Sequence, residues 1–170
     1  MILRARLTAG LERWRRRCVD QAAVGLPAHA TMLYPFVALE RLGPAVRARL
    51  ARVARRRSPI AHVLDGPRLW PDVVYLSLDP SEPFVELQRD LGRAFPDFPI
   101  YGPEFDLEFV PHVTIAEEGA ECVPLGDPAW RSLPLAAVAS AIEVIARPAD
   151  GRWRTVWRIP LGGRAAPADR

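Results

Sequence analysis

The sequence predicts a fold of mixed helices and strands that is built from two similar halves. Two observations predict it: helical and strand-like stretches alternate along the chain, and one order of elements occurs twice. Each half begins with a helix and a strand of pattern His-x-Thr and ends in a hairpin, and the two motif histidines are 83 residues apart. We therefore expect a single domain over residues 1–170, with halves at about 8–78 and 82–161 that bring the two motifs together across a cleft.

The first half is predicted to contain two helices and a hairpin. Apolar residues at helical spacing predict an amphipathic helix over residues 7–20, and the strand of His29 follows it. A second, basic helix is predicted over residues 44–57, with a proline at its start. Two strand-like runs, 60–64 and 73–78, are separated by glycine and prolines, which predicts a hairpin.

The second half repeats this order. An apolar stripe predicts a helix over residues 81–95 with Ser81 as its cap, and the strand of His112 follows. A proline-rich stretch after that strand predicts short turns, and two further strands are expected on either side of the turn at 148–151. Residues 162–170 are small and polar, and we expect a flexible tail there.

Both motifs place an imidazole beside a hydroxyl. Side chains alternate across a strand, so His29 and Thr31 share one face while the apolar residues around them share the other. His112 and Thr114 repeat this arrangement. A single His-x-Thr pair is more often a satisfied polar group in a core, whereas two copies at equivalent positions favour a functional site. The third histidine, His62, lacks a companion hydroxyl, and we interpret it as a strand histidine without a chemical role.

The composition is that of a globular protein, with 49% hydrophobic residues. No apolar run approaches the roughly 18 residues of a membrane span, and the first residues lack the apolar core of a signal peptide. We therefore expect a cytoplasmic protein, and a monomer. Cys18 and Cys122 are far apart and lack a metal-ligand spacing, which predicts free, reduced thiols, no metal and no cofactor.

Charge is distributed unevenly along the chain, and every basic side chain is an arginine. Residues 1–57 carry a net charge of +10, residues 58–130 carry −11, and the remainder carries +4. This asymmetry either draws a phosphate-bearing ligand toward one side or reflects solvated helix faces, and the sequence leaves both interpretations open.

The two motifs carry a resemblance to a known family. The stretches "GLPAHATMLYPF" and "FVPHVTIA" resemble the 2H phosphoesterase superfamily, and particularly its 2′-5′ RNA ligase-like branch. This resemblance implies a bilobal α+β fold with antiparallel sheets around a central cleft, and a metal-independent attack on a phosphodiester, often a 2′,3′-cyclic phosphate. It also implies that His29 and His112 are the catalytic pair and that Thr31 and Thr114 hold the phosphate oxygens.

The chain departs from the family pattern at two places. Many relatives have a phosphate-binding arginine five residues after the second histidine, and this chain has Glu117 there. The strand that precedes the first helix in the family has only residues 1–7 available here. Aromatic residues near the motifs and near the last strand are expected to pack in the core rather than bind substrate, namely Tyr34, Phe36, Trp153 and Trp157.

Imidazole chemistry supports the same function independently of the resemblance. Hydrolysis of a phosphodiester requires one group that takes a proton and one that gives a proton, and imidazole titrates near neutral pH. With the substrate class that the resemblance implies, we expect a phosphodiesterase that acts on 2′,3′-cyclic phosphates or 2′-5′ linkages of RNA ends or small nucleotides. Two alternatives stay open: a non-catalytic module that binds nucleotides or RNA ends, and a metal site made by the two histidines.

Overall fold

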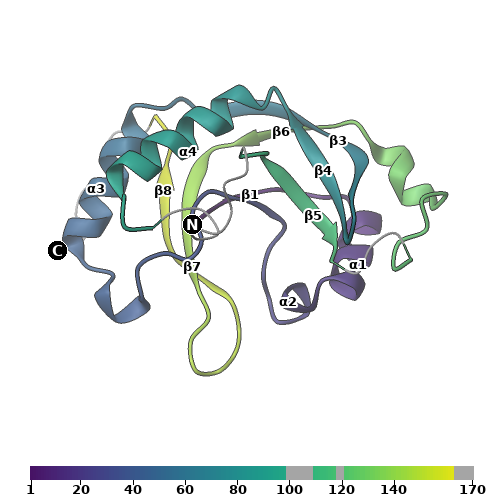
Figure 1. Cartoon of the computed structure of the whole chain (residues 1–170), viewed down its shortest axis with the longest axis horizontal. Helices are drawn as coiled ribbons and strands as arrows, with labels where there is room; N and C mark the ends of the chain where they lie inside the picture. Colours follow the sequence, from purple (N-terminus) through teal and green to yellow (C-terminus); the bar gives the residue numbers. More distant parts are fainter. Residues whose placement is uncertain (99–108, 118–120, 163–170) are drawn as a thin grey trace.

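Two four-stranded antiparallel sheets form the body of the protein (Figure 1). The computed structural model describes residues 1–98, 109–117 and 121–162. The strands of the first sheet, in spatial order, are β2 (His29–Thr31), β1 (Ile2–Arg4), β7 (Ala141–Ala146) and β8 (Arg154–Pro160). Those of the second sheet are β5 (His112–Ala116), β4 (Val73–Asp79), β3 (Ile60–Trp70) and β6 (Leu135–Ala139). The predicted α+β fold with antiparallel sheets is confirmed.

The helices agree with the sequence pattern to within a few residues. They are α1 (Ala9–Cys18), α2 (Asp20–Ala23), α3 (Pro44–Arg55), α4 (Glu82–Ala94) and the short 3-10 helices η1 (Leu39–Arg41) and η2 (Pro128–Ser132). The apolar stripe of α4 is fully buried and α3 packs against α4, which joins both helices to the core. Ser81 occupies the predicted cap position of α4, but its backbone angles are already helical and its side chain makes no capping hydrogen bond.

The repeated unit in the structure is strand, helix, histidine strand. The first unit is β1, α1 and β2, and the second is β4, α4 and β5. In each unit the two strands pair directly, so the short strand at the start of the chain is the partner of the first histidine strand. The hairpins are exchanged between the halves: β3 and β4 lie in the sheet of His112, while β7 and β8 lie in the sheet of His29. Each sheet therefore takes strands from both halves of the sequence.

One strand is not predicted by the local sequence. Residues of β6 are mostly alanine, which has a low preference for strands, and they follow a proline-rich stretch. Their pairing with β3 over five register positions makes them a strand, so tertiary contacts outweigh the local preference. β6 forms one edge of the second sheet, and β5 forms the other.

Cys18 and Cys122 form a disulfide, so the expectation of free thiols is wrong. Their Cα atoms are 5.8 Å apart although 104 residues separate them in the sequence. The fold brings them together because α1 packs against β5, where the N–H of Glu117 donates a hydrogen bond to the carbonyl of Cys18 at 3.0 Å. The spacing of the two cysteines in the sequence does not indicate that they lie close together in the fold.

None of the helices in the described part of the chain is both long enough and apolar enough to cross a membrane.

Candidate active site

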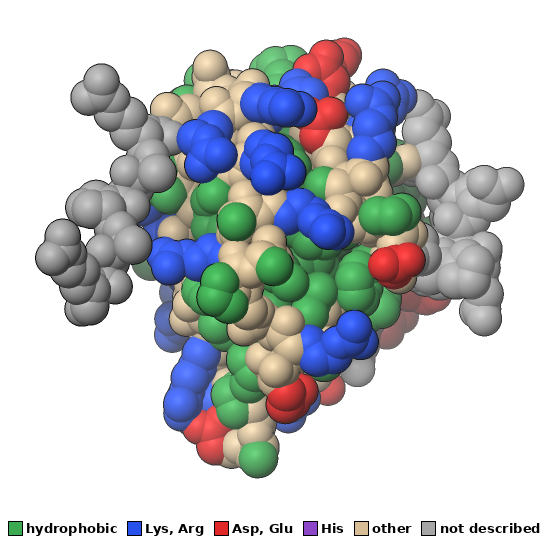
Figure 2. All heavy atoms as spheres, turned by 90° about the vertical axis from the view of Figure 1, so that its left-hand side faces the viewer, with side chains coloured by type: hydrophobic (Ala, Val, Ile, Leu, Met, Phe, Trp, Pro, Cys, Tyr) green, Lys and Arg blue, Asp and Glu red, His purple; other side chains and the backbone are tan. Residues whose placement is uncertain are grey.

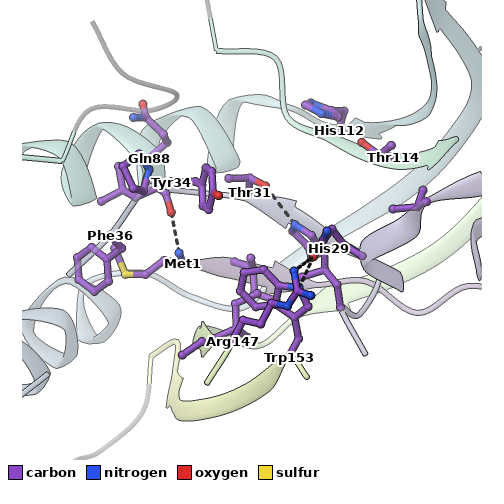
Figure 3. Close-up of a pocket in the computed structure, with 18 of the residues that line it drawn as sticks. Met1, His29, Thr31, Tyr34, Phe36, Gln88, His112, Thr114, Arg147 and Trp153 are labelled. Atoms are coloured by element: carbon purple, nitrogen blue, oxygen red, sulfur yellow. Dashed lines mark hydrogen bonds between the residues drawn. The ribbon is translucent and has the colours of Figure 1, made fainter. Parts of the chain in front are cut away.

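The two histidine strands lie at the edges of their sheets, and these edges meet. β2 is an edge strand of the first sheet, β5 is an edge strand of the second, and the two contact each other. The residues that alternate with the motif side chains are buried, which holds each strand in one register: Ala30 on β2 and Val113 on β5 are at most 1% exposed. As a result His29, Thr31, His112 and Thr114 all line one large cleft (Figure 3).

His29 is oriented by two hydrogen bonds. Its Nδ1 lies 2.7 Å from the carbonyl oxygen of Pro27, and its Nε2 lies 3.2 Å from the Oγ1 of Thr31. The carbonyl can only accept, so Nδ1 carries a proton, and the lone pair of Nε2 in the neutral ring accepts from the hydroxyl of Thr31. Burial, with a smaller contribution from the positive charge of Arg15, lowers the pKa of His29 to about 4 against the opposing effect of the Pro27 bond. His29 is therefore neutral at pH 7.

His112 repeats this orientation on the other strand. Its Nδ1 lies 2.8 Å from the carbonyl oxygen of Val110, which again leaves the lone pair on Nε2. Burial lowers the pKa of His112, and the bond to Val110 opposes this effect. His112 also adds to the charges that lower the pKa of His29, which is consistent with two imidazoles that face the same space.

His62 shows which feature distinguishes the motif histidines. It also donates from Nδ1 to a carbonyl two residues earlier, that of Ile60, at 3.0 Å. Its ring is buried on β3 and packs edge to face against Phe84, with the ring centroids 5.1 Å apart, and it lies outside the wall of the cleft. The prediction that His62 is a strand histidine outside the site is therefore confirmed in its placement. What sets His29 and His112 apart is that both line the shared cleft, whereas His62 does not.

Aromatic side chains form part of the cleft wall. Trp70 packs against His112 with ring centroids 4.6 Å apart, and it stacks on Tyr75 at 4.1 Å. Tyr34 is 58% exposed and lines the cleft, so its expected core packing is wrong; β2 ends at Thr31, and strand alternation does not extend to it.

Two further aromatic residues near the cleft differ from each other. Phe36 packs edge to face on Phe95 as expected. Trp153 lies before β8 instead of on it, lines the cleft, and donates from Nε1 to the Oε1 of Gln21 at 2.9 Å (Figure 3). Its expected burial in the core is wrong because it belongs to the loop between β7 and β8.

Three arginines and two glutamates line the cleft: Arg15, Arg89, Arg147, Glu40 and Glu117. Arg15 is buried on α1, whereas Arg89 and Arg147 are exposed. Burial raises the pKa of Glu117, and the charge of Arg15 opposes this. Arg15 had a recognisable signal in the sequence, because it occupies a buried helical position four residues after Leu11.

The described residues contain no group of three or more His, Cys, Asp or Glu that could hold a metal ion. The polar groups that line the cleft include the threonine hydroxyls, the imidazoles and the arginines. Such groups suit an anion with several oxygen acceptors, which is the chemistry of a phosphate.

Comparison with known proteins gives the same assignment. The profile of the 2′-5′ RNA ligase superfamily matches residues 4–150. A curated relative, "Putative phosphoesterase GK0864" of Geobacillus kaustophilus, is 28% identical over 111 residues. That match covers 62% of this chain and 61% of the relative, so the chain spans less than two thirds of the curated relative's length.

Solved structures share the fold. LigT of E. coli complexed with NADP+ has a TM-score of 0.57 and 20% identity, with 96% of this chain and 100% of that chain covered. TT0787 of Thermus thermophilus has a TM-score of 0.56 and 19% identity, with 92% of both chains covered. The resemblance seen in the two His-x-Thr motifs is therefore confirmed, and this chain belongs to the 2′-5′ RNA ligase superfamily.

Proposed function

We propose that this protein is a phosphodiesterase that opens a 2′,3′-cyclic phosphate, or cleaves a 2′-5′ linkage, in an RNA end or a small nucleotide. The observation that carries the proposal is the pair of imidazoles, each held by its Nδ1 and each presenting Nε2 to one cleft. Membership in the superfamily and the name of the curated relative support phosphoesterase chemistry in general. LigT has been solved with 3′-AMP and with NADP+, which supports a nucleotide as the ligand class.

His29 is the proposed general base and His112 the proposed general acid. His29 is neutral at pH 7 because burial lowers its pKa to about 4, and its Nε2 lone pair becomes available when the Thr31 hydroxyl turns from it to the bound phosphate. It takes a proton from water while the water oxygen forms a bond to phosphorus. The bond from phosphorus to one ribose oxygen breaks, and that oxygen takes the proton of protonated His112. The negative charge of the bound phosphate favours this protonated state of His112.

Thr31 and Thr114 are the proposed donors to the non-bridging phosphate oxygens. Each lies two residues after its histidine on the same face of the strand, so a phosphate between the imidazoles meets both hydroxyls. Removal of one such donor costs about 2 to 4 kcal/mol of transition-state stabilisation. Substitution of either threonine by valine should therefore slow turnover by about 30- to 10³-fold.

The size of the cleft and the exposed arginines of α3 favour an RNA end over an isolated mononucleotide as the substrate. The cleft has a volume of about 2190 Å³, which exceeds the roughly 300–1,000 Å³ of typical small-molecule sites. Arginines gather on the face of the molecule that carries α3 (Figure 2), and the exposed arginines of α3 and its C-terminal end include Arg47, Arg52 and Arg56. Exposed arginines of this kind bind the phosphates of a polynucleotide without regard to base sequence.

Hydrolysis assays test the proposal. The four nucleoside 2′,3′-cyclic phosphates, a 2′-5′-linked dinucleotide and a short RNA with a cyclic phosphate end are incubated with the protein, with and without EDTA. The phosphate position in the product is read by phosphorus NMR. We expect turnover that survives EDTA and leaves the phosphate on the 2′ oxygen. Loss of turnover in EDTA would instead support the metal site.

Glu117 favours a second candidate, a module that binds nucleotides without turnover. Its carboxylate places a negative charge in the cleft when ionised, which opposes the binding of a second anion. In the same assays, measurable nucleotide binding without turnover of any substrate would support this module.

A further inference from the structure

Arg15 is buried in a position where a helix normally places an apolar side chain. It is 2% exposed, while its neighbours Arg13, Arg16 and Arg17 on α1 are exposed. It shares its face of the helix with the buried residues Leu11 and Cys18 and reaches the wall of the cleft that holds both motif histidines. A buried guanidinium needs a compensating partner, because removal of a charge from water is costly.

The described residues do not supply that partner. One nitrogen of Arg15, Nη1, donates to the carbonyl oxygen of Leu26 at 2.8 Å, and this acceptor is neutral. Nε is buried without an acceptor among residues 1–98, 109–117 and 121–162, and no carboxylate of those residues lies within 4.0 Å of the guanidinium. Burial lowers the pKa of Arg15, and the more distant charges of Glu12 and Glu117 oppose this. The positive charge is therefore incompletely neutralised in the free protein.

Arg4 shows how the edge of a guanidinium formed by Nε and Nη2 binds an anion. Its Nε and Nη2 together hold the carboxylate of Glu143, at 3.1 Å and 2.7 Å. In Arg15 the bond to Leu26 occupies Nη1, on the opposite side of the group, and leaves the edge formed by Nε and Nη2 without an acceptor among the described residues. This edge binds a phosphate by two parallel charge-assisted hydrogen bonds.

Arg15 lines the same cleft as the two motif histidines. Its positive charge is the largest charge effect on the pKa of His29. Arg147, another arginine of the cleft, already donates to the carbonyl of Gly151 at 2.8 Å and to Gln21 at 3.2 Å. Arg15 is thus the cleft arginine that combines burial with an Nε–Nη2 edge that has no acceptor among the described residues.

We propose that Arg15 is the phosphate-binding residue of this protein, and that its Nε and Nη2 hold a non-bridging oxygen pair of the phosphate that lies between His29 and His112. This inference rests on the proposed function for the identity of the phosphate as part of a substrate. It assigns to α1 a binding role that is independent of the two His-x-Thr strands. Glu117, in the same cleft, weakens phosphate binding when it is ionised.

Phosphate titrations test this role directly. Inorganic phosphate and adenosine 2′-monophosphate are titrated into the intact protein and three variants, Arg15→Gln, Arg16→Gln and Glu117→Gln, by calorimetry. Arg16 is the matched control, because it lies next to Arg15 on α1, carries the same charge and is exposed. We expect Arg15→Gln to weaken binding about tenfold or more, since a hydrogen bond to a charged group is lost. Arg16→Gln should keep the wild-type affinity, and Glu117→Gln should bind phosphate more tightly.

A second readout does not depend on how Arg15→Gln folds. The Nε–H resonance of Arg15 is followed by nitrogen-15 NMR in the wild-type protein as phosphate is added, and it should shift with the same dissociation constant as the calorimetric binding. An unchanged resonance at saturation, no binding of phosphate by the wild type, or wild-type affinity in a folded Arg15→Gln would overturn the inference. If phosphate binding requires Arg15 but no cyclic phosphate is turned over, the inference holds and the proposed hydrolysis fails. If Arg15→Gln turns over a cyclic phosphate with the KM of the wild type, the proposed hydrolysis holds and the inference about Arg15 fails.

Discussion

The imidazole of His112 packs against the indole of Trp70 with their ring centroids 4.6 Å apart. Trp70 therefore contributes to the burial that lowers the pKa of His112. We expect Trp70→Ala to raise the pKa of His112 toward its ordinary value, because removal of the indole exposes the imidazole to water. The pKa of His29 should stay unchanged. Proton NMR titration of the histidine ring resonances measures both values. An unchanged pKa of His112 would mean that other groups bury its ring.

Acid should destabilise the protein through its histidines. The unfolded chain binds a proton on His29 below its ordinary pKa of 6.5, whereas the folded protein binds it only near pH 4. The unfolded state thus binds more protons in this window, so the free energy of unfolding should fall as the pH decreases from about 6.5 to about 4. His62 and His112 act in the same direction, because burial lowers their pKa as well.

Urea unfolding across this pH window measures the effect. The variant His29→Gln should show a shallower dependence than the wild type, since it lacks one of the three groups. If the wild type and His29→Gln had the same slope, His29 would not have a lowered pKa in the folded protein.

The disulfide should stabilise the fold substantially. Cys18 and Cys122 close a long loop between α1 and the segment after β5, and loss of a native disulfide typically costs about 2 to 5 kcal/mol. The double variant Cys18→Ser with Cys122→Ser should lower the free energy of unfolding by this order, and reductant should do the same to the wild type. Alkylation of the unreduced, unfolded protein followed by mass spectrometry is the control. Modification of both cysteines without prior reduction would contradict the bond.

Local pattern was sufficient to predict the candidate site, and tertiary contacts explain what it missed. The faces of β2 and β5 follow from strand alternation, which depends only on neighbouring residues, so His29 and His112 could be found. The approach of Cys18 to Cys122 and the position of Trp70 beside His112 depend on how α1 and β3 pack, and nothing near them in the sequence records this. Arg15 is an intermediate case, since its position four residues after Leu11 lies on the buried face of the helix, whereas nothing in the sequence indicates that its Nε lacks an acceptor.

The exposed arginines of α3 and its C-terminal end should contribute to the binding of RNA and not to that of mononucleotides. Arg52 and Arg56 are both exposed there. Removal of each arginine that binds a phosphate should reduce the slope of the logarithm of the binding constant against the logarithm of the salt concentration by about one. The variant Arg52→Gln with Arg56→Gln is compared with Arg131→Gln, an exposed arginine of η2. Affinity for a short RNA is measured at several salt concentrations by fluorescence anisotropy. Equal salt slopes in the wild type and both variants would show that α3 does not contact the RNA.

The central claim is that two imidazoles across one cleft act on a single phosphodiester. The most direct test compares kcat/KM for a nucleoside 2′,3′-cyclic phosphate in the wild type and in His29→Gln, His112→Gln and His62→Gln, with the fold of each checked by circular dichroism. We expect a loss of at least about 10²-fold for each motif histidine, because one proton transfer is removed, and near wild-type turnover for a folded His62→Gln. Wild-type turnover in a folded His29→Gln or His112→Gln would contradict this claim.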